Sequence, residues 1–347
     1  LDEIIKENKN KNKLDNRDIG FISEIVYGVT SWKLTIDEII KKYSKIRLKK
    51  ISPWILNILR MTIYQIIFLD KVPKSAAVNE GVNLAKRYGH RGSSNFANAI
   101  LRQVDKKDYE TFFEIEDPIE RISKTTSMPI WIVEKLTKEN TIEKVEEICK
   151  ASNIKPKVTI RVNKLKTTIQ DLEQKLKERE ITFKEGTLED FLILDKAKNI
   201  ENLDLFQDGY FTVQDEGAGL IAKILDPKSK EFVLDACSSP GGKTTYMAEL
   251  MQNEGKIIAC DLHAHRVKLV EENAKRLGIT IIETRCADAS SYNEKYKEKF
   301  DKILLDVPCL GIGVLKRKPD IKWKRKPEDI TEITRIQQNI LETCSKY

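Results

Sequence analysis

Two short stretches of this 347-residue sequence carry side chains that could take part in covalent chemistry. The first is LLDVPCLGIG (residues 304–313), in which Asp306, Pro308 and Cys309 follow an apolar run typical of a buried strand. Carbon 5 of a pyrimidine is a poor nucleophile, and a thiolate that adds to carbon 6 makes it reactive enough to take a methyl group. A neighbouring acid that hydrogen-bonds to the ring or protonates it stabilises the adduct. Asp306 and Cys309 therefore indicate methyl transfer to a pyrimidine carbon.

The second stretch, LDACSSPGGKTT (residues 234–245), predicts a cofactor loop between a strand and a helix. It ends like a phosphate-binding P-loop, but Cys237 stands where that motif requires glycine. The dinucleotide pattern G-x-G-x-x-G is also absent. Asp235 ends the strand, and Gly241 and Gly242 let the backbone approach a ligand closely. S-adenosylmethionine carries no phosphate, and it is the cofactor that this loop favours.

Two more acids follow the next strands of the same region. Asp261 stands 19 residues after Gly242, at the end of the second predicted strand, where a carboxylate can hold ribose hydroxyls. Asp288 in CADAS follows the third strand and could reach the adenine amino group. Any one of these acids alone would be read as a surface or capping carboxylate. Together with Asp235, at successive strand ends, they predict an S-adenosylmethionine site.

A parallel, doubly wound sheet is the element that must position these residues. From Phe232 onward strand-like and helix-like segments alternate, which is typical of an α/β Rossmann-like domain. We assign this domain to residues 209–347. Before it, residues 146–208 predict a small α+β insert, with strands at 155–163 and 191–195 and a helix at 168–180.

Residues 1–145 predict an all-α helical bundle. Ser52 and Pro53 form a helix start, and polar residues interrupt the apolar run 53–69, which indicates a buried helix and no membrane span. Ser75 is expected to cap the next helix, and Ser93 or Ser94 the one after it. The fold class is therefore multidomain: a helical bundle, an α+β insert and an α/β domain.

Composition narrows the class of protein further. The net charge of +7 suits a nucleic-acid partner as well as a solvated lysine-rich surface. Six cysteines without a C-x-x-C pair and three histidines predict a reduced, cytoplasmic protein with no metal site. Cys149, Cys260 and Cys286 are interpreted as small apolar core residues. The chain opens on Leu1 and ends on Tyr347 in mid-pattern, so we expect a piece of a longer protein.

A basic segment follows the strand that carries Cys309. In residues 315–329, Trp323 stands among several cations, which favours contact with an RNA backbone over a merely solvated loop. These cations include Lys316, Arg317, Lys318, Lys322, Lys324 and Arg325. We assign RNA binding to Lys316, Arg317, Lys318 and Trp323.

The motifs VLDACSSPGGKTTYMAEL, DLHAHRVKLVEENAKRLG, LLDVPCLGIGVLKRKPDIKW and FTVQDEGAGL resemble the NOL1/NOP2/Sun family of RNA cytosine-5 methyltransferases. The segments RDIGFISEIVYGV, ILRMTIYQIIFLDKVPKSAAVNEGVNLAKRYG and SNFANAILR resemble a NusB-like helical domain. The combination is similar to bacterial members that methylate 16S ribosomal RNA, and it covers nearly the whole chain. It implies a C-terminally incomplete methyltransferase domain, an RNA-binding helical domain and S-adenosylmethionine as cofactor.

The resemblance also assigns residues to roles. The catalytic positions are Asp306 and Cys309, and the cofactor-site positions are Cys237, Ser238, Ser239, Pro240, Gly241, Gly242, Lys243, Asp261, Arg266, Asp288 and Asp306. In this family the attacking thiolate belongs to a Thr-Cys pair after the next strand, and the Pro-Cys thiol helps release the product. Thr343-Cys344 imitates that pair, but Cys344 lies on the apolar stripe of a helix and is interpreted as a core residue. We expect the nucleophile beyond Tyr347.

Alternatives remain open at this point. Within the same enzyme class the rival substrate is transfer RNA. From a different class, the rival is a non-catalytic NusB-like protein that binds RNA or transcription factors. We expect a monomer that binds 16S ribosomal RNA, with no membrane and no metal partner.

Overall fold

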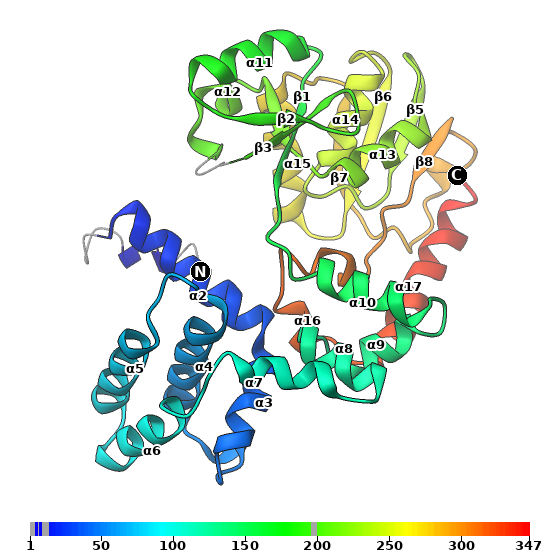
Figure 1. Cartoon of the computed structure of the whole chain (residues 1–347). Helices are drawn as coiled ribbons and strands as arrows, with labels where there is room; N and C mark the ends of the chain where they lie inside the picture. Colours follow the sequence, from blue (N-terminus) through cyan, green and yellow to red (C-terminus); the bar gives the residue numbers. More distant parts are fainter. Residues whose placement is uncertain (1–3, 6, 9–13, 196–199) are drawn as a thin grey trace. The chain divides into compact units, whose positions relative to one another are not determined.

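The computed structural model describes residues 4–5, 7–8, 14–195 and 200–347. It divides into two compact units, each considered by itself (Figure 1). The first unit combines residues 1–155 with residues 311–327, and the second combines residues 156–310 with residues 328–347. Residues 311–327 thus pack with the helical part, although they were assigned to domain 209–347 above.

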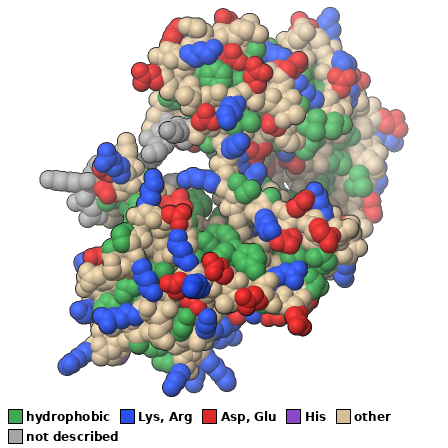
Figure 2. Space-filling view, in the orientation of Figure 1, with side chains coloured by type: hydrophobic (Ala, Val, Ile, Leu, Met, Phe, Trp, Pro, Cys, Tyr) green, Lys and Arg blue, Asp and Glu red, His purple; other side chains and the backbone are tan. Residues whose placement is uncertain are grey.

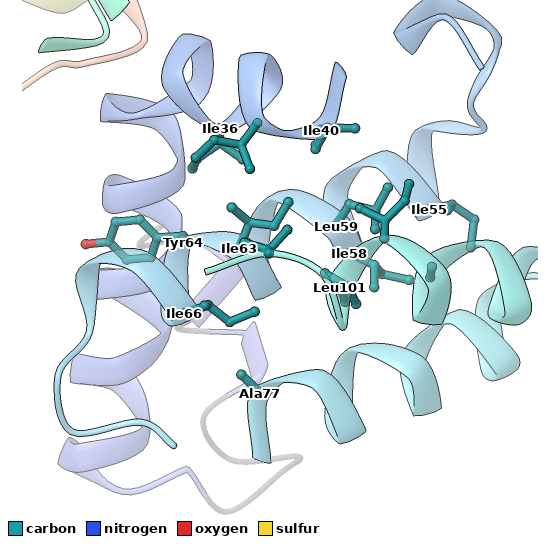
Figure 3. Packing of buried hydrophobic residues seen from close by; sticks show 14 of the residues in the cluster. Ile36, Ile40, Ile55, Ile58, Leu59, Ile63, Tyr64, Ile66, Ala77 and Leu101 are labelled. Carbon is teal, nitrogen blue, oxygen red and sulfur yellow. The ribbon is translucent and has the colours of Figure 1, made fainter. Parts of the chain in front are cut away.

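The first unit is all-helical, as predicted. Helix α4 lies in its core and buries eight residues, Tyr64 among them (Figure 3). The helices are α2 (Asn16–Ser31), α3 (Lys33–Tyr43), α4 (Pro53–Phe68), α5 (Lys74–Tyr88), α6 (Arg91–Leu101), α7 (Lys107–Glu110), α8 (Pro118–Thr126), α9 (Ile130–Leu136), α10 (Ile142–Ala151) and α16 (Ile321–Lys324), with short 3-10 turns η1 (Leu48–Lys50), η2 (Thr111–Glu114) and η5 (Ile312–Val314).

The predicted helix starts are right in one case and wrong in two. Ser52 caps α4, because its hydroxyl accepts a hydrogen bond from the backbone N–H of Ile55. The prediction for Ser75 is wrong, since α5 begins at Lys74 after Pro73. Ser93 and Ser94 are also inside a helix, because α6 begins earlier, at Arg91. His90 caps α6 instead: its ring nitrogen accepts from the N–H of Ser93.

The second unit contains two four-stranded sheets. The first is antiparallel, with strand order β2-β3-β1-β4, and buries Ile160 and Val162 against helix α11. Its elements are β1 (Val158–Val162), α11 (Ile169–Glu178), β2 (Phe183–Glu185), β3 (Phe191–Leu194), η3 (Ile200–Asn202), α12 (Asp204–Gln207) and β4 (Phe211–Val213). The strands at 155–163 and 191–195 and the helix at 168–180 are confirmed. β2 and β4 were missed because each is only three residues long.

The second sheet is parallel, with strand order β7-β6-β5-β8, which confirms the predicted α/β architecture. Helices α13, α14 and α15 supply the core on one face, and α17 packs on the other face through Ile340 and Cys344. The elements are α13 (Glu216–Leu225), β5 (Phe232–Asp235), α14 (Gly242–Leu250), β6 (Lys256–Asp261), α15 (Ala264–Leu277), β7 (Ile282–Cys286), η4 (Glu294–Tyr296), β8 (Lys302–Leu304) and α17 (Asp329–Cys344). No helix among the described residues is long and apolar enough to cross a membrane.

Two glycines of α2 should respond in opposite ways to the same substitution. A Cβ at Gly28 would overlap the ring of Tyr64 on α4, whereas a Cβ at Gly20 would meet nothing within 4 Å. Gly28→Ala should therefore lower the free energy of unfolding by about 1–3 kcal/mol through overpacking. Gly20→Ala should raise it by about 1 kcal/mol, the usual helix-propensity difference. Urea denaturation monitored by circular dichroism measures both, and equal effects would contradict the close approach of α2 to α4.

Candidate cofactor and catalytic site

The loop between β5 and α14 is held by backbone contacts and by one left-handed glycine. The N–H and the hydroxyl of Ser238 both donate to the carbonyl of Cys260 on β6, at 2.8 and 3.0 Å. Gly241 has φ +98°, and a Cβ there would lie 3.2 Å from the Cα of Val270. Side chains rarely adopt that conformation, so the second half of the loop requires glycine. The loop lies at the carboxyl end of β5.

Asp235, the last residue of β5, is a buried acid. Burial raises the pKa of its carboxyl to about 7, and the negative charge of Asp306 acts in the same direction. The hydroxyl of Thr244, which donates to Oδ2 at 2.7 Å, lowers this pKa in part. The first carboxylate of the predicted site is thus a structural acid beneath the loop.

Asp261 ends β6 and is 5% exposed. The backbone N–H of His263 donates to its Oδ1 at 3.1 Å, and the guanidinium of Arg266 lies 3.6 Å from Oδ2. Arg266 also donates to the carbonyl of Ser239, whose hydroxyl donates back to the carbonyl of Arg266. The structure therefore brings Asp261, Arg266 and the loop together, as the assignment of these residues to one site requires.

The strand β8 delivers the two residues assigned to catalysis. Asp306, half exposed, forms an ion pair with Lys243 of α14, with Nζ 2.6 Å from Oδ2. The carbonyl of Pro308 accepts from the amide of Gln337 on α17 at 2.9 Å, which fixes the backbone next to Cys309. The thiol of Cys309 is exposed. Lys243, an assigned cofactor residue, is thus in contact with the catalytic turn.

Asp288 lies apart from these contacts. Its Oδ1 accepts from the N–H and the hydroxyl of Ser290, and these hydrogen bonds lower the pKa of its carboxyl. It lines a cavity of about 360 Å³ beside α17, together with Cys260, Cys344 and Tyr347. The loop glycines, Asp261 and Asp306 do not line this cavity.

The cysteines differ sharply in access. Cys344 is buried on α17, which confirms its interpretation as a core residue, and Cys149 and Cys260 are buried as predicted. Cys286 is exposed, so its interpretation as a core residue is wrong: it is the last residue of β7, at the edge strand of the sheet. Burial, with the nearby acids Asp235 and Asp261, raises the pKa of the half-buried Cys237 thiol to about 12, so this thiol is a poor nucleophile.

The basic segment is partly built into the first unit. Lys316 and Lys318 are exposed and Arg317 is half-buried. Lys322, counted above with the RNA-facing cations, is 1% exposed, and its ammonium lies 2.7 Å from Oδ1 of Asn153. It also donates to the carbonyls of Ser31 and Ser127 at 3.2 and 3.3 Å, and burial lowers its pKa to about 8.

Trp323 also has a contact that sequence analysis did not foresee. Its indole N–H donates to the carbonyl of Thr30, at the end of α2, at 2.7 Å. The ammonium of Lys33 stands 5.3 Å from the centre of its ring. The half-buried Trp323 therefore anchors the segment to α2, whatever part its ring has in binding RNA.

A buried arginine beneath the loop was missed. Arg161 on β1 is fully buried, and its guanidinium donates to the carbonyl of Gly242 at 2.9 Å. It pairs with Glu249 of α14 at 2.7 Å and also donates to Gln214. Its guanidinium lies 4.5 Å from the ring centre of Tyr246.

The period-2 pattern of residues 158–162 concealed this role. Val158, Ile160 and Val162 were read as the buried face, so Arg161 fell on the face expected to meet solvent. That face instead packs on α14, and a buried arginine needs the partners that α14 provides. A strand with one buried face and one arginine on the other carries no sequence signal for this arrangement.

These residues fit S-adenosylmethionine better than a nucleoside triphosphate. Lys243, the lysine that a P-loop would turn toward phosphate, is paired with Asp306. The carboxylates of Asp261 and Asp306 lie at or just after the ends of the strands next to the loop and would repel phosphate, whereas they suit a sulfonium cation and a ribose diol. No group of three or more His, Cys, Asp or Glu residues that could hold a metal ion occurs in the described ranges.

Comparison with protein families gives three matches. The 16S rRNA methyltransferase RsmB/F family matches residues 222–347, the NusB family residues 1–106, and a ferredoxin-like domain of RsmF/B-like methyltransferases residues 128–201. The probable ribosomal RNA small subunit methyltransferase B of Bacillus subtilis is 39% identical over 97% of this chain and 76% of its own length. That of Synechocystis is 34% identical over 96% of this chain and 76% of its own length.

Solved structures agree on the fold. The crystal structure of PH0851 covers 98% of this chain and 77% of its own, with a TM-score of 0.78 and 25% identity. A methyltransferase homolog from Pyrococcus horikoshii covers 66% of this chain and 72% of its own, with a TM-score of 0.57 and 28% identity. NSun6 from the same organism, crystallised with SFG, covers 63% of this chain and 79% of its own, with a TM-score of 0.56. At 22% identity it supports the fold alone.

The buried acid of β5 should make stability depend on pH. The pKa of Asp235 is about 7 in the folded chain against an ordinary 3.8, so the folded state holds this proton more tightly than the unfolded state does. The free energy of unfolding should therefore fall as pH rises from about 4 to about 7. Asp235→Asn has no carboxyl at this position and should not lose stability in this way. The free energy of unfolding of the variant, relative to that of the parent chain, should therefore rise by roughly 2–3 kcal/mol between pH 5 and pH 7.

Urea denaturation of both chains at pH 5, 6, 7 and 8 measures the difference. Asp288→Asn is the matched control, because the carboxyl of Asp288 is exposed and its pKa is lowered. Its stability relative to the parent should not rise over this range. Parallel pH profiles for Asp235→Asn and the parent would contradict a buried, protonated Asp235.

Proposed function

We propose that this chain, which belongs to the 16S rRNA methyltransferase RsmB/F family, supplies the cofactor site and the release thiol of an enzyme that transfers a methyl group from S-adenosylmethionine to carbon 5 of a cytosine in 16S ribosomal RNA. The observation that carries the proposal is the turn after β8. There the exposed thiol of Cys309 stands three residues after Asp306, which is ion-paired to Lys243 of the loop helix. Cofactor loop and thiol therefore meet at one edge of the parallel sheet.

The cofactor would be held by the backbone of the β5–α14 loop, from Cys237 to Lys243, and by Asp261. The carboxylate of Asp261 is oriented by the N–H of His263 and by Arg266, which leaves it directed to accept from ribose hydroxyls. Asp288 is assigned to the adenine amino group. When bound, S-adenosylmethionine supplies an electrophilic methyl group on a positively charged sulfur.

Asp306 would orient the base. Its carboxylate is fixed by Lys243, and it can accept a hydrogen bond from the exocyclic amino group of cytosine. The base must leave its stack, or be unpaired, before its carbon 6 can meet a thiol. Cys309 is assigned to product release: after methylation the proton on carbon 5 is removed, the carbon 5–carbon 6 double bond re-forms, and the attacking sulfur leaves as a thiolate.

The alternatives differ in substrate or in activity. The relatives are named as ribosomal RNA methyltransferases, which favours 16S ribosomal RNA over transfer RNA. A non-catalytic binding protein would have no use for Asp306 and Cys309 beside a cofactor loop. We propose that residues 1–145 and the insert 146–208 orient the RNA and that residues 209–347 form the catalytic domain of a cytoplasmic monomer. Bisulfite sequencing of ribosomal and transfer RNA from a deletion strain tests the substrate.

Cofactor binding should depend on Asp261. Asp261→Ala removes charge-assisted hydrogen bonds to the ribose and should weaken S-adenosylmethionine binding by roughly 1.5–3 kcal/mol. Isothermal titration calorimetry measures the change, with Glu272→Ala, an exposed acid on α15, as the matched control. Unchanged affinity of Asp261→Ala would contradict the assignment. Tighter binding of ATP with Mg²⁺ would restore the P-loop interpretation.

An experiment can distinguish whether Cys309 helps to release the product or attacks carbon 6 of the base. The 347-residue chain should bind S-adenosylmethionine yet form no adduct with RNA that survives denaturation, because release and attack belong to different thiols. In a chain that also carries the expected Thr-Cys pair, Cys309→Ala should accumulate the adduct. A denaturing gel with labelled RNA detects it as a shifted band. A shifted band from residues 1–347, lost in Cys309→Ala and kept in Cys344→Ala, would make Cys309 the nucleophile.

A further inference from the structure

A groove between helices α5 and α6 of the first unit has no part in the site described above. Its volume is about 760 Å³, and residues of these two helices line it. Three exposed cations, Lys74, Lys86 and Arg102, and three asparagines, Asn79, Asn95 and Asn98, supply most of its polar surface. Val78 and Val82, half-buried, supply its apolar surface.

The charge of the groove is one-sided. None of its lining residues is acidic, although Lys74 forms an ion pair with Asp105 outside the lining, with Nζ 3.8 Å from Oδ2. Across the described residues, Lys86 and Arg102 have no acidic partner within ion-pair distance. Figure 2 shows Lys and Arg side chains over the lower left of the drawn face, where Figure 1 places α5 and α6.

Some cations of the same unit have acidic partners. Examples are the ion pairs Lys41–Glu38, Lys42–Asp108, Arg60–Asp37, Lys106–Asp70 and Lys124–Glu120. Lys86 and Arg102, in a groove whose lining contains no acid, keep a positive potential there, which attracts a polyanion.

The dimensions and the amides suit a nucleic-acid strand. Lys74 and Lys86 are 12 residues apart on α5, which places their Cα atoms about 18 Å apart at about 1.5 Å per residue. That length can follow several phosphates. Asparagine amides both donate and accept, so they can bind the edges of unpaired bases or the ribose hydroxyl.

We propose that the α5–α6 groove binds the sugar-phosphate backbone of single-stranded ribosomal RNA. The inference rests on the proposed function, which supplies RNA as the polyanion, and it adds a contact surface far in sequence from the catalytic turn. Lys74, Lys86 and Arg102 neutralise phosphates, and the asparagines hydrogen-bond to the exposed bases and ribose.

The test replaces the three cations together. Lys74→Gln, Lys86→Gln and Arg102→Gln form the groove variant, and Lys107→Gln, Lys135→Gln and Lys138→Gln form a control with the same loss of charge at exposed positions of the same unit. Fluorescence anisotropy with a labelled single-stranded 16S fragment gives the affinity as a function of salt. The groove variant should bind at least tenfold more weakly, and its salt slope should fall by about 2, since each lost single-strand phosphate contact contributes about 0.7.

The control should stay within twofold of the parent chain in RNA affinity. Ultraviolet cross-linking and mass spectrometry should place RNA on peptides of α5 and α6 in the parent and not in the groove variant. Equal RNA affinity of the two variants, or cross-links confined to other helices, would overturn the proposal; a groove that holds a protein would give this result. Calorimetry with S-adenosylmethionine separates the groove proposal from the proposed function. If the parent chain binds cofactor and RNA and the groove variant keeps the same RNA affinity, only the groove proposal is refuted. If the parent chain binds neither, the proposed function is refuted.

Discussion

A guanidinium with no exposed surface constrains the whole second unit. Arg161 comes from the antiparallel sheet, and its partners Gly242 and Glu249 belong to the helix that follows the cofactor loop. Removing a charge from water costs several kcal/mol, and this cost is offset only when the partners are in place. A shift of β1 by one residue would turn Arg161 to the opposite face of its sheet. The register of a small sheet is thereby linked to the backbone of the loop.

The parallel sheet determines which side chains lie close together. Parallel strands end at one edge, so Asp235, Asp261 and the turn after β8 meet there although 71 residues separate the first from Asp306. The two cysteines of interest lie on different parts of this architecture. Cys309 is exposed on a turn at that edge, while Cys344 is buried under the face that α17 covers. Access, and not residue type, distinguishes a thiol that can react from one that packs.

Much of the fold followed from period and spacing, because strands and helices differ in how often a side chain returns to the same face. The parallel sheet, the buried helix at 53–69 and the insert helix at 168–180 are of this kind. Helix starts were harder: Ser75 and Ser93 have the right side chains, but Pro73 and His90 begin the helices two and three residues earlier. The positions of the loop glycines and of Asp261 at strand ends could be predicted from sequence, since they depend on strand-loop-helix units that are local in the chain. Arg161 could not, since its partners lie 53 to 88 residues away in the chain.

The lysines and arginines illustrate why charge in a sequence is a weak guide to partners. Each contributes +1 to the net charge, but in the structure these residues differ in burial and in their partners. Lys322 is enclosed by two carbonyls and an amide and stabilises the packing of α16. Lys243 forms an ion pair with Asp306 and fixes that side chain. Lys86 faces a groove without an acidic neighbour. Only an exposed cation without an acidic neighbour, such as Lys86, can attract a polyanion strongly. A buried or paired charge is already compensated by groups inside the molecule. In a basic run such as residues 315–325, only the cations that remain exposed, such as Lys316 and Lys318, are therefore available to attract a polyanion.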